Sequence, residues 1–135
     1  MIKAARLGKE IVVTVVNKIG ILADISKIVS SHGINIEAVA GYAVNNEAKV
    51  MLVTVDNLRA TDALKKAGYN SLKENEVIVV DLENKPGALR IVTEQLAVLG
   101  IDIKQIYGTV CSAGCPARMV LTTSDNEKVL VAFKK

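Results

Sequence analysis

Apolar residues along this chain fall into short continuous runs that alternate with longer amphipathic stretches. Residues 10–16 and 77–82 consist mostly of Val, Ile and Leu with little polar alternation, and such runs predict strands that are buried on both faces. After each run, apolar residues recur at helical spacing over residues 22–31 and 88–99. This spacing predicts two amphipathic helices, each laid on a sheet.

Weaker patterns complete each half of the chain. Residues 34–44 alternate apolar with polar, Asn45 and Asn46 form a turn pair, and residues 49–55 are expected to be the return strand. Asp56 and Asn57 are expected to cap a helix that ends at Gly68, before a short strand at 69–72. The second half predicts strands at 101–110 and 117–123, a loop at 111–116 and a brief helix at 126–133.

This order of elements predicts an α+β fold of two ferredoxin-like βαββαβ units, packed side by side, each with an antiparallel sheet and its helices on one face. An internal repeat supports two units. Without a gap, the repeat pairs Asn17 with Asn84, Lys18 with Lys85, Gly20 with Gly87, Leu22 with Leu89, Gly33 with Gly100, Ile34 with Ile101, Ile36 with Ile103 and Gly41 with Gly108.

We place the first unit at residues 1–73 and the second at residues 74–135. Residues 1–8 are expected to be a short basic lead-in. The second unit then lacks a closing strand, and its sheet edge would be finished by another segment, either the N-terminal residues or a partner chain.

Composition narrows the function classes. Half of the residues are hydrophobic but only 3% are aromatic and Trp is absent, so the cores must be built from Val, Ile, Leu and Ala. A net charge of +3 without a clustered basic face does not predict nucleic-acid binding. No apolar run is long enough to span a bilayer and no signal peptide is evident, so we expect a cytoplasmic protein without membrane contact.

The turn at residues 84–89 has the chemistry of an anion site. Pro86 suits the first turn of a helix, and Gly87 lets the backbone come close to a neighbour. The amide groups of Gly87, Ala88 and Leu89 would then point outward at the positive end of a helix dipole, where a carboxylate binds well. The alternative is that the glycine only makes a tight connection in a module that binds nothing.

Both turns resemble those of the ACT domain, a small ligand-binding regulatory module. The resemblance is carried by residues 84–89, with Leu96 and residues 99–103, and by residues 17–22, with residues 33–36. It implies two ACT-type units that pair through an edge strand and bind an amino acid at the joint. The first turn departs from the family pattern at Ile19, where the family usually has Pro.

Carried onto this chain, the resemblance implies ligand contacts from both turns and from the strands facing them. These residues are Asn84, Lys85, Pro86, Gly87, Ala88 and Leu89; Asn17, Gly20, Ile21 and Leu22; Asn35 and Ile36; Asp102 and Ile103. Turn amides would hold the α-carboxylate, and an Asn or Asp side-chain oxygen would accept from the α-ammonium. Tyr42 and Tyr107 are expected to face opposite sides of their sheets. Tyr107 is the expected ligand neighbour, because the family often has an aromatic there.

Cys111 and Cys115 have no counterpart in the first half. Two thiols at this spacing could share a metal ion or close a redox-sensitive disulfide. A complete zinc site would need further ligands, from His32, carboxylates or a second chain. Two reduced thiols are the simpler expectation in the cytoplasm. We expect His32 to cap a helix end.

No pattern of catalytic residues is present, so we expect a binding protein that is not an enzyme and needs no cofactor. The leading hypothesis is a tandem regulatory protein, a homodimer, that senses an amino acid and acts on an enzyme or another protein. The alternatives are a thiol-dependent metal or redox sensor centred on Cys111 and Cys115, and a purely structural adaptor.

Overall fold

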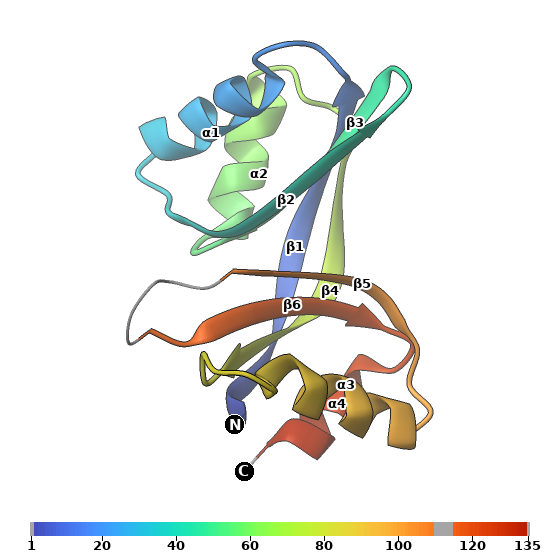
Figure 1. The fold of residues 1–135 in the computed structure, drawn as a ribbon. Coiled ribbons are helices and arrows are strands. Elements are labelled where there is room, and N and C mark those ends of the chain that lie inside the picture. The colour runs from blue at the N-terminus through green and yellow to red at the C-terminus, as the bar shows by residue number, and fades with distance from the viewer. Residues whose placement is uncertain (1, 110–114, 135) are drawn as a thin grey trace. The chain divides into compact units, whose positions relative to one another are not determined.

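The computed structural model describes residues 2–109 and 115–134. The chain divides into two compact units, Lys9–Asn75 and Met1–Gly8 together with Glu76–Lys135. Both units have the predicted α+β arrangement, with two helices over one face of a sheet (Figure 1). In the part of the chain that the structure describes, no helix is long and apolar enough to cross a membrane.

The unit of residues 9–75 takes its strands in the order β2-β3-β1-β4. Strand β3 pairs antiparallel with both β1 and β2. The elements that contribute to this unit are β1 (Ile2–Val16), α1 (Ile21–Ser31), β2 (Ile36–Val44), β3 (Glu47–Thr54), α2 (Asn57–Lys66) and β4 (Leu72–Leu82). Of the two long strands, the unit holds β1 from residue 9 onward and β4 up to residue 75.

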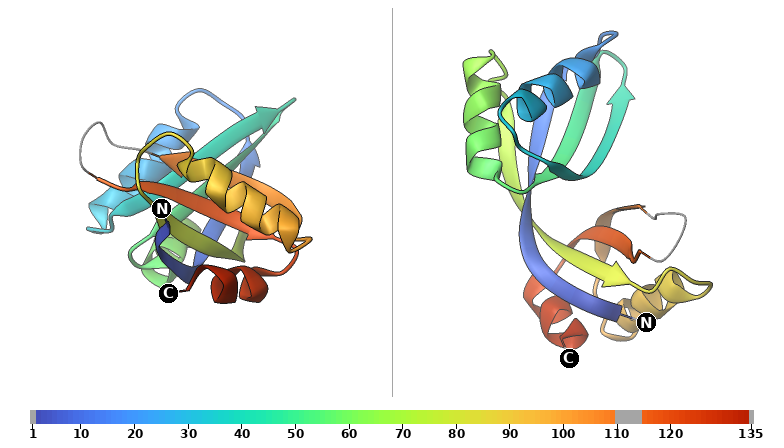
Figure 2. Two further views of the ribbon diagram at one scale, coloured as in Figure 1. Left: turned by 60° about the horizontal axis from the view of Figure 1, so that its bottom comes forward. Right: turned by 90° about the vertical axis from the view of Figure 1, so that its left-hand side faces the viewer.

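The other unit repeats this plan with the order β1-β4-β6-β5. Strand β6 pairs antiparallel with both β4 and β5, and both helices again lie on one face of the sheet (Figure 2). The further elements are α3 (Ala88–Val98), β5 (Ile103–Thr109), β6 (Ala117–Thr123) and α4 (Asn126–Phe133).

The N-terminal residues differ from the sequence-based expectation. Instead of a lead-in, residues from Ile2 onward are part of β1, and Met1–Gly8 group with Glu76–Lys135. Ile2 and Ala5 pack against the core of that unit. Of the two sources considered for the missing closing strand, the N-terminal segment therefore provides it. The sequence did not predict this strand, because Lys3 and Arg6 interrupt its apolar pattern.

Each unit has its own core, built from aliphatic side chains as the composition predicted. The unit of residues 9–75 buries Ile11, Val13, Ile25, Val29, Ile34, Val50, Leu52, Ala60 and Leu64. The other unit buries Ile78, Val80, Leu82, Ala88, Val92, Leu96, Ile101, Ala117, Leu121, Val129 and Phe133. The strand residues of each set lie on the helix-covered face, because alternate residues of a strand point to opposite sides.

A hydrogen-bonded clasp joins a strand to the second helix of the first unit. The Oδ1 atom of Asn57 accepts from the backbone N–H of Thr54 at 3.1 Å and from its hydroxyl at 2.7 Å. The amide of Asn57 donates to the carbonyl of Lys9 at 2.8 Å. Asp56 caps α2 by accepting from the backbone N–H of Arg59, which confirms the predicted cap. The clasp satisfies the buried hydroxyl and fixes where α2 begins.

The second unit contains the same clasp. Asn126 accepts from the backbone and hydroxyl of Thr123 at 3.0 and 2.7 Å and donates to the carbonyl of Glu76 at 3.1 Å. Asp125 caps α4. The repeat alignment of the turns missed this match, because more residues separate β5 from β6 than separate β2 from β3, and this shifts the register of the residues that follow.

Removing the clasp should destabilise the protein. In the Asn57→Ala variant, the buried hydroxyl and N–H of Thr54 lose their acceptor, so we expect the free energy of unfolding to fall by about 2 kcal/mol. Urea denaturation measures this change. Asn70→Ala, at an exposed position without a side-chain hydrogen bond among the described residues, is the control and should cost less than about 0.5 kcal/mol. Equal losses would contradict the role of the clasp.

Candidate functional site

Both predicted binding turns place a left-handed glycine directly before a helix. Gly20 has φ 89° and Gly87 has φ 87°, and α1 and α3 begin at the next residue. Glycine is favoured here because a side chain strains this backbone conformation. Pro86 lies in the turn before Gly87, so the expectation that it sits in the first helical turn was wrong. The left-handed glycine, which proline cannot replace, starts the helix instead.

The backbone amides at these turns are only partly available. The N–H of Ala88 donates to the carbonyl of Lys85 at 3.2 Å, and Ile21 makes the same contact with Lys18 at 3.3 Å. Within the described part of the chain, no group accepts from the N–H of Leu22 or Leu89. First-turn N–H groups of this kind can bind an anion. The anion seat of each turn therefore has fewer amides than the three expected.

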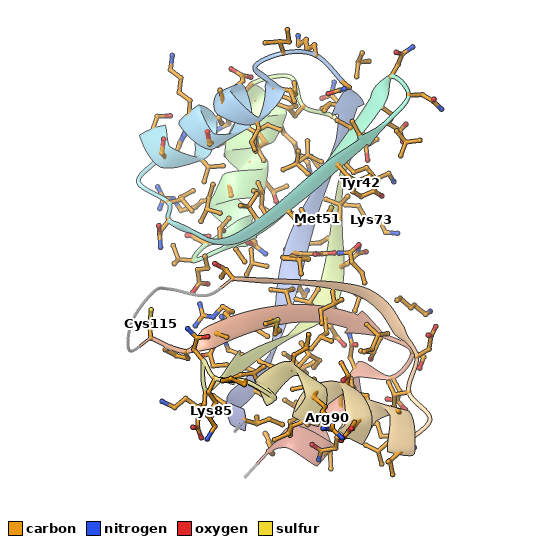
Figure 3. The ribbon with its side chains drawn as sticks, in the orientation of Figure 1. Tyr42, Met51, Lys73, Lys85, Arg90 and Cys115 are labelled. Atoms are coloured by element: carbon orange, nitrogen blue, oxygen red, sulfur yellow. The ribbon has the colours of Figure 1, made fainter. Side chains whose placement is uncertain are left out.

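The side chains of the second turn interact with each other. The Lys85 ammonium, at the turn that precedes α3 (Figure 3), is 3.0 Å from a carboxylate oxygen of Glu83. The hydrogen bond from Lys85 is the main cause that lowers the pKa of Glu83 from its ordinary value. Lys85 is thus already paired with a carboxylate of its own turn.

The first turn borders a hollow beside the edge strand, here named the edge hollow. Its volume is ≈ 260 Å³, and its lining comprises Asn17, Ile21 and Leu22 of the turn, residues 39–43 of β2, and residues 48–50 of β3. Most of these side chains are apolar. Three predicted site residues are therefore brought together, with a stretch of β2 that the sequence had not singled out.

The predicted residues at the starts of the edge strands lie elsewhere. Asn35 and Asp102 precede β2 and β5, and their carbonyls accept from the backbone N–H groups of Val55 and Ser124. Beside them, the pairing register shifts between Ile36 and Ala38, and equivalently after Ile103. Neither Asn35 nor Ile36 is part of the lining of the edge hollow. Asp102 and Ile103 belong, with residues 84–89, to the other unit.

The two tyrosines face the same side of their sheets, so the expectation of opposite sides was wrong. Tyr42 pairs with Lys49 and Tyr107 with Val120, and both pairs lie on the faces without helices, because the adjoining residues Val50 and Leu121 belong to the helix-covered cores. In the repeat alignment, the two tyrosines are two positions apart, and residues two apart on a strand point to the same side of the sheet. Tyr42, on β2 (Figure 3), borders the edge hollow, whereas Tyr107 lies in the other unit.

The cysteine and histidine predictions have mixed outcomes. Cys115 is disulfide-bonded, so the expectation of reduced thiols was wrong at that residue; Cys111 lies outside the described residues. Among the residues that are described, no group of three or more His, Cys, Asp or Glu side chains could hold a metal. His32 ends α1 as predicted, with its Nδ1 atom 2.9 Å from the carbonyl of Ile28.

A second hollow, which the sequence did not predict, lies where α1 begins and α2 ends. This helix-end hollow has a volume of ≈ 530 Å³ and is lined by residues 14–16, Lys18, Ile21, Asp24 and residues 67–70. The Tyr69 hydroxyl donates to the Asp24 carboxylate. Burial, then this hydrogen bond, then the charge of Asp24, raise the pKa of Tyr69 from 10.0 to about 12. No local pattern could reveal the pair, because its members are 45 residues apart.

Residues 11–68 match the family model described as the AHAS small subunit-like ACT domain. This match confirms the ACT resemblance over the first unit. Among curated proteins, none matches the chain.

Solved structures share the fold of the whole chain. Protein BT0572 from Bacteroides thetaiotaomicron aligns with a TM-score of 0.82 at 24% identity, covering 95% of this chain and 87% of that one. The ligand-free regulatory subunit of aspartate kinase from Thermus thermophilus aligns at 0.65 and 14% identity, covering 98% and 95%. E. coli aspartokinase III in complex with lysine and aspartate aligns at 0.55 and 18% identity, covering 96% and 31%.

The left-handed backbone at Gly20 can be tested by substitution. Gly20→Ala should lower the free energy of unfolding by about 1 kcal/mol, because alanine is strained at positive φ although nothing crowds its Cβ. Gly20→Asn should cost less, since asparagine tolerates this conformation. Gly41→Ala is the control, because its Cβ would meet only the Lys49 carbonyl and a Val50 methyl at ordinary contact distances. Urea denaturation that ranks Gly41→Ala as the most harmful would contradict this account.

The Tyr69–Asp24 bond predicts a dependence on alkaline pH. Tyrosine in the unfolded chain loses its proton near pH 10, whereas folded Tyr69 keeps it until about pH 12. The raised pKa therefore stabilises the fold fully below pH 10, and this contribution is lost as the pH rises towards 12. We expect the stability difference between wild type and Tyr69→Phe to shrink over that interval in denaturation experiments. A difference that stays constant would contradict the prediction.

Proposed function

Because residues 11–68 match the model of an ACT domain, we propose that the protein senses a small amino acid at the edge hollow and passes the signal on through its association with other chains. The supporting observation is that Asn17, Ile21 and Leu22 of the predicted turn line one hollow with β2. The match of the family model covers these residues.

The chemistry of the edge hollow suits an amino acid. The free N–H of Leu22 lies at the positive end of α1, where a carboxylate is stabilised. The side-chain oxygen of Asn17 is an acceptor for an ammonium group. Ile21 and Leu22, with Val39 and Val50, supply apolar surface for a ligand side chain.

We further propose that a second chain completes the site. Strand β2 is at the edge of its unit, and Val39, Tyr42 and Val44 on it are 49%, 53% and 60% exposed. An edge strand has unpaired backbone groups that can bind another strand, and exposed apolar side chains favour such an association. In the resulting homodimer, Asn35 and Ile36 of one copy would face the turn of the other. The turn at 84–89, with Asp102, Ile103 and Tyr107, would form the equivalent site.

The regulated partner is proposed to be an enzyme. One protein of the same fold is the regulatory subunit of aspartate kinase, and another is an aspartokinase that was crystallised with lysine and aspartate. A ligand alters such a partner only when it binds two arrangements of the protein with different affinity.

The function is tested by calorimetric titration of the full chain with each of the twenty amino acids. We expect at least one of them to bind. Ala43→Leu should weaken that binding roughly tenfold or more, because the larger side chain fills the edge hollow.

Ala23→Leu is the matched control, since Ala23 is exposed on α1 and borders neither hollow. It should bind as wild type does. The absence of heat with all twenty amino acids would overturn the proposal, and equal weakening by both variants would place the site elsewhere.

A further inference from the structure

The helix-end hollow is lined by side chains of both charges, which the edge hollow is not. Lys18 and Asp24 place side chains of opposite charge on one hollow of ≈ 530 Å³, a size within the range of small-molecule sites. In the part of the chain described, no acidic side chain pairs with Lys18. Asp24 accepts from a neutral hydroxyl and forms no ion pair there. A cation and an anion thus border the same space without neutralising each other.

We propose that the helix-end hollow binds a small zwitterion, a molecule with one carboxylate and one ammonium group. Lys18 receives the carboxylate and Asp24 receives the ammonium. Tyr69 is a positioning residue: its hydroxyl occupies the Oδ2 atom of Asp24, which leaves Oδ1 for the ligand. This site is separate from the edge hollow, and it does not require a second chain.

The dipoles of helices α1 and α2 add a partial positive and a partial negative charge to the same hollow. Helix α1 begins at Ile21 and helix α2 ends at Lys66, and residues next to both ends line the hollow. The start of a helix carries a partial positive charge and its end a partial negative charge. A zwitterion aligned from the start of α1 to the end of α2 gains from both, whereas a simple anion or cation is attracted by one end and repelled by the other.

The floor of the hollow sets the size of the ligand side chain. Val15 and Ile21 are half-buried and pack against the core of the unit. They offer apolar surface to a short aliphatic group beside the two charges. In the other unit, the repeat places Ile91 where Asp24 stands, so the acidic partner is missing at that position.

Three probes separate the two charges: L-alanine, L-alaninamide, which keeps only the ammonium, and N-acetyl-L-alanine, which keeps only the carboxylate. Each is titrated into the ¹⁵N-labelled full chain, and backbone amide shifts are followed. We expect L-alanine to bind most tightly, with shifts at Lys18, Asp24 and residues 67–70. Equal affinity for all three probes would overturn the proposal.

Charge variants identify the two partners. Asp24→Asn should weaken L-alanine and L-alaninamide by roughly three- to tenfold and leave N-acetyl-L-alanine unchanged. Lys18→Gln should weaken the binding of N-acetyl-L-alanine and leave that of L-alaninamide unchanged. Lys27→Gln, on α1 but outside both hollows, should leave the binding of all three probes unchanged. If it weakens binding as much as Lys18→Gln does, the effect is one of general charge and the assignment fails.

The outcomes also separate this site from the proposed function. Shifts from L-alanine confined to residues 39–43 would overturn the zwitterion site and support the edge hollow. Shifts confined to Lys18, Asp24 and residues 67–70 would support the zwitterion site alone. If none of the three probes shifts any residue, the helix-end site is excluded, while the proposed function is still decided by titration with the twenty amino acids.

Discussion

The left-handed backbone at Gly20 and Gly87 determines how each unit is assembled. A chain that leaves a strand and enters a helix at once must reverse direction within a few residues, and positive φ at one residue makes this reversal possible. At the start of each helix, the N–H of Leu22 or Leu89 then has no acceptor in the described part of the chain. The edge hollow exists because the turn places Ile21 and Leu22 near β2. The helix-end hollow exists because the same turn places Lys18 and Asp24 near the end of α2.

The second helix of each unit is held in place by the hydrogen-bonded clasp and not by a glycine turn. Asn57 and Asn126 each hold a buried threonine and also donate to a backbone carbonyl, of β1 and of β4 respectively. Nearby, Arg59 donates to the carbonyl of His32, and Lys128 donates to that of Leu99, so a basic residue of the second helix satisfies the end of the first. These contacts occur in both units, and they make the framework on which the turns are held.

The two units differ at the positions where ligands would bind. Ile19 is fully exposed where the second turn has Pro86. Glu83 binds Lys85 in the second turn, whereas Val16 stands at the equivalent position of the first and leaves Lys18 without that partner. The repeat therefore preserves the framework while the chemistry of the turns diverges.

The sequence by itself determined the two-unit α+β plan, the glycine turns and the cap at Asp56, because periodicity, backbone preference and capping are local properties. It also singled out Asn17, Ile21 and Leu22. Tertiary structure decided which strand closes the second unit, since the partner of β4 lies far away at residues 2–8 and its apolar pattern is broken by charges. It alone brought Tyr69 to Asp24. Hydrogen bonds between distant residues form only once packing has brought the elements together, so no local pattern in the chain encodes them.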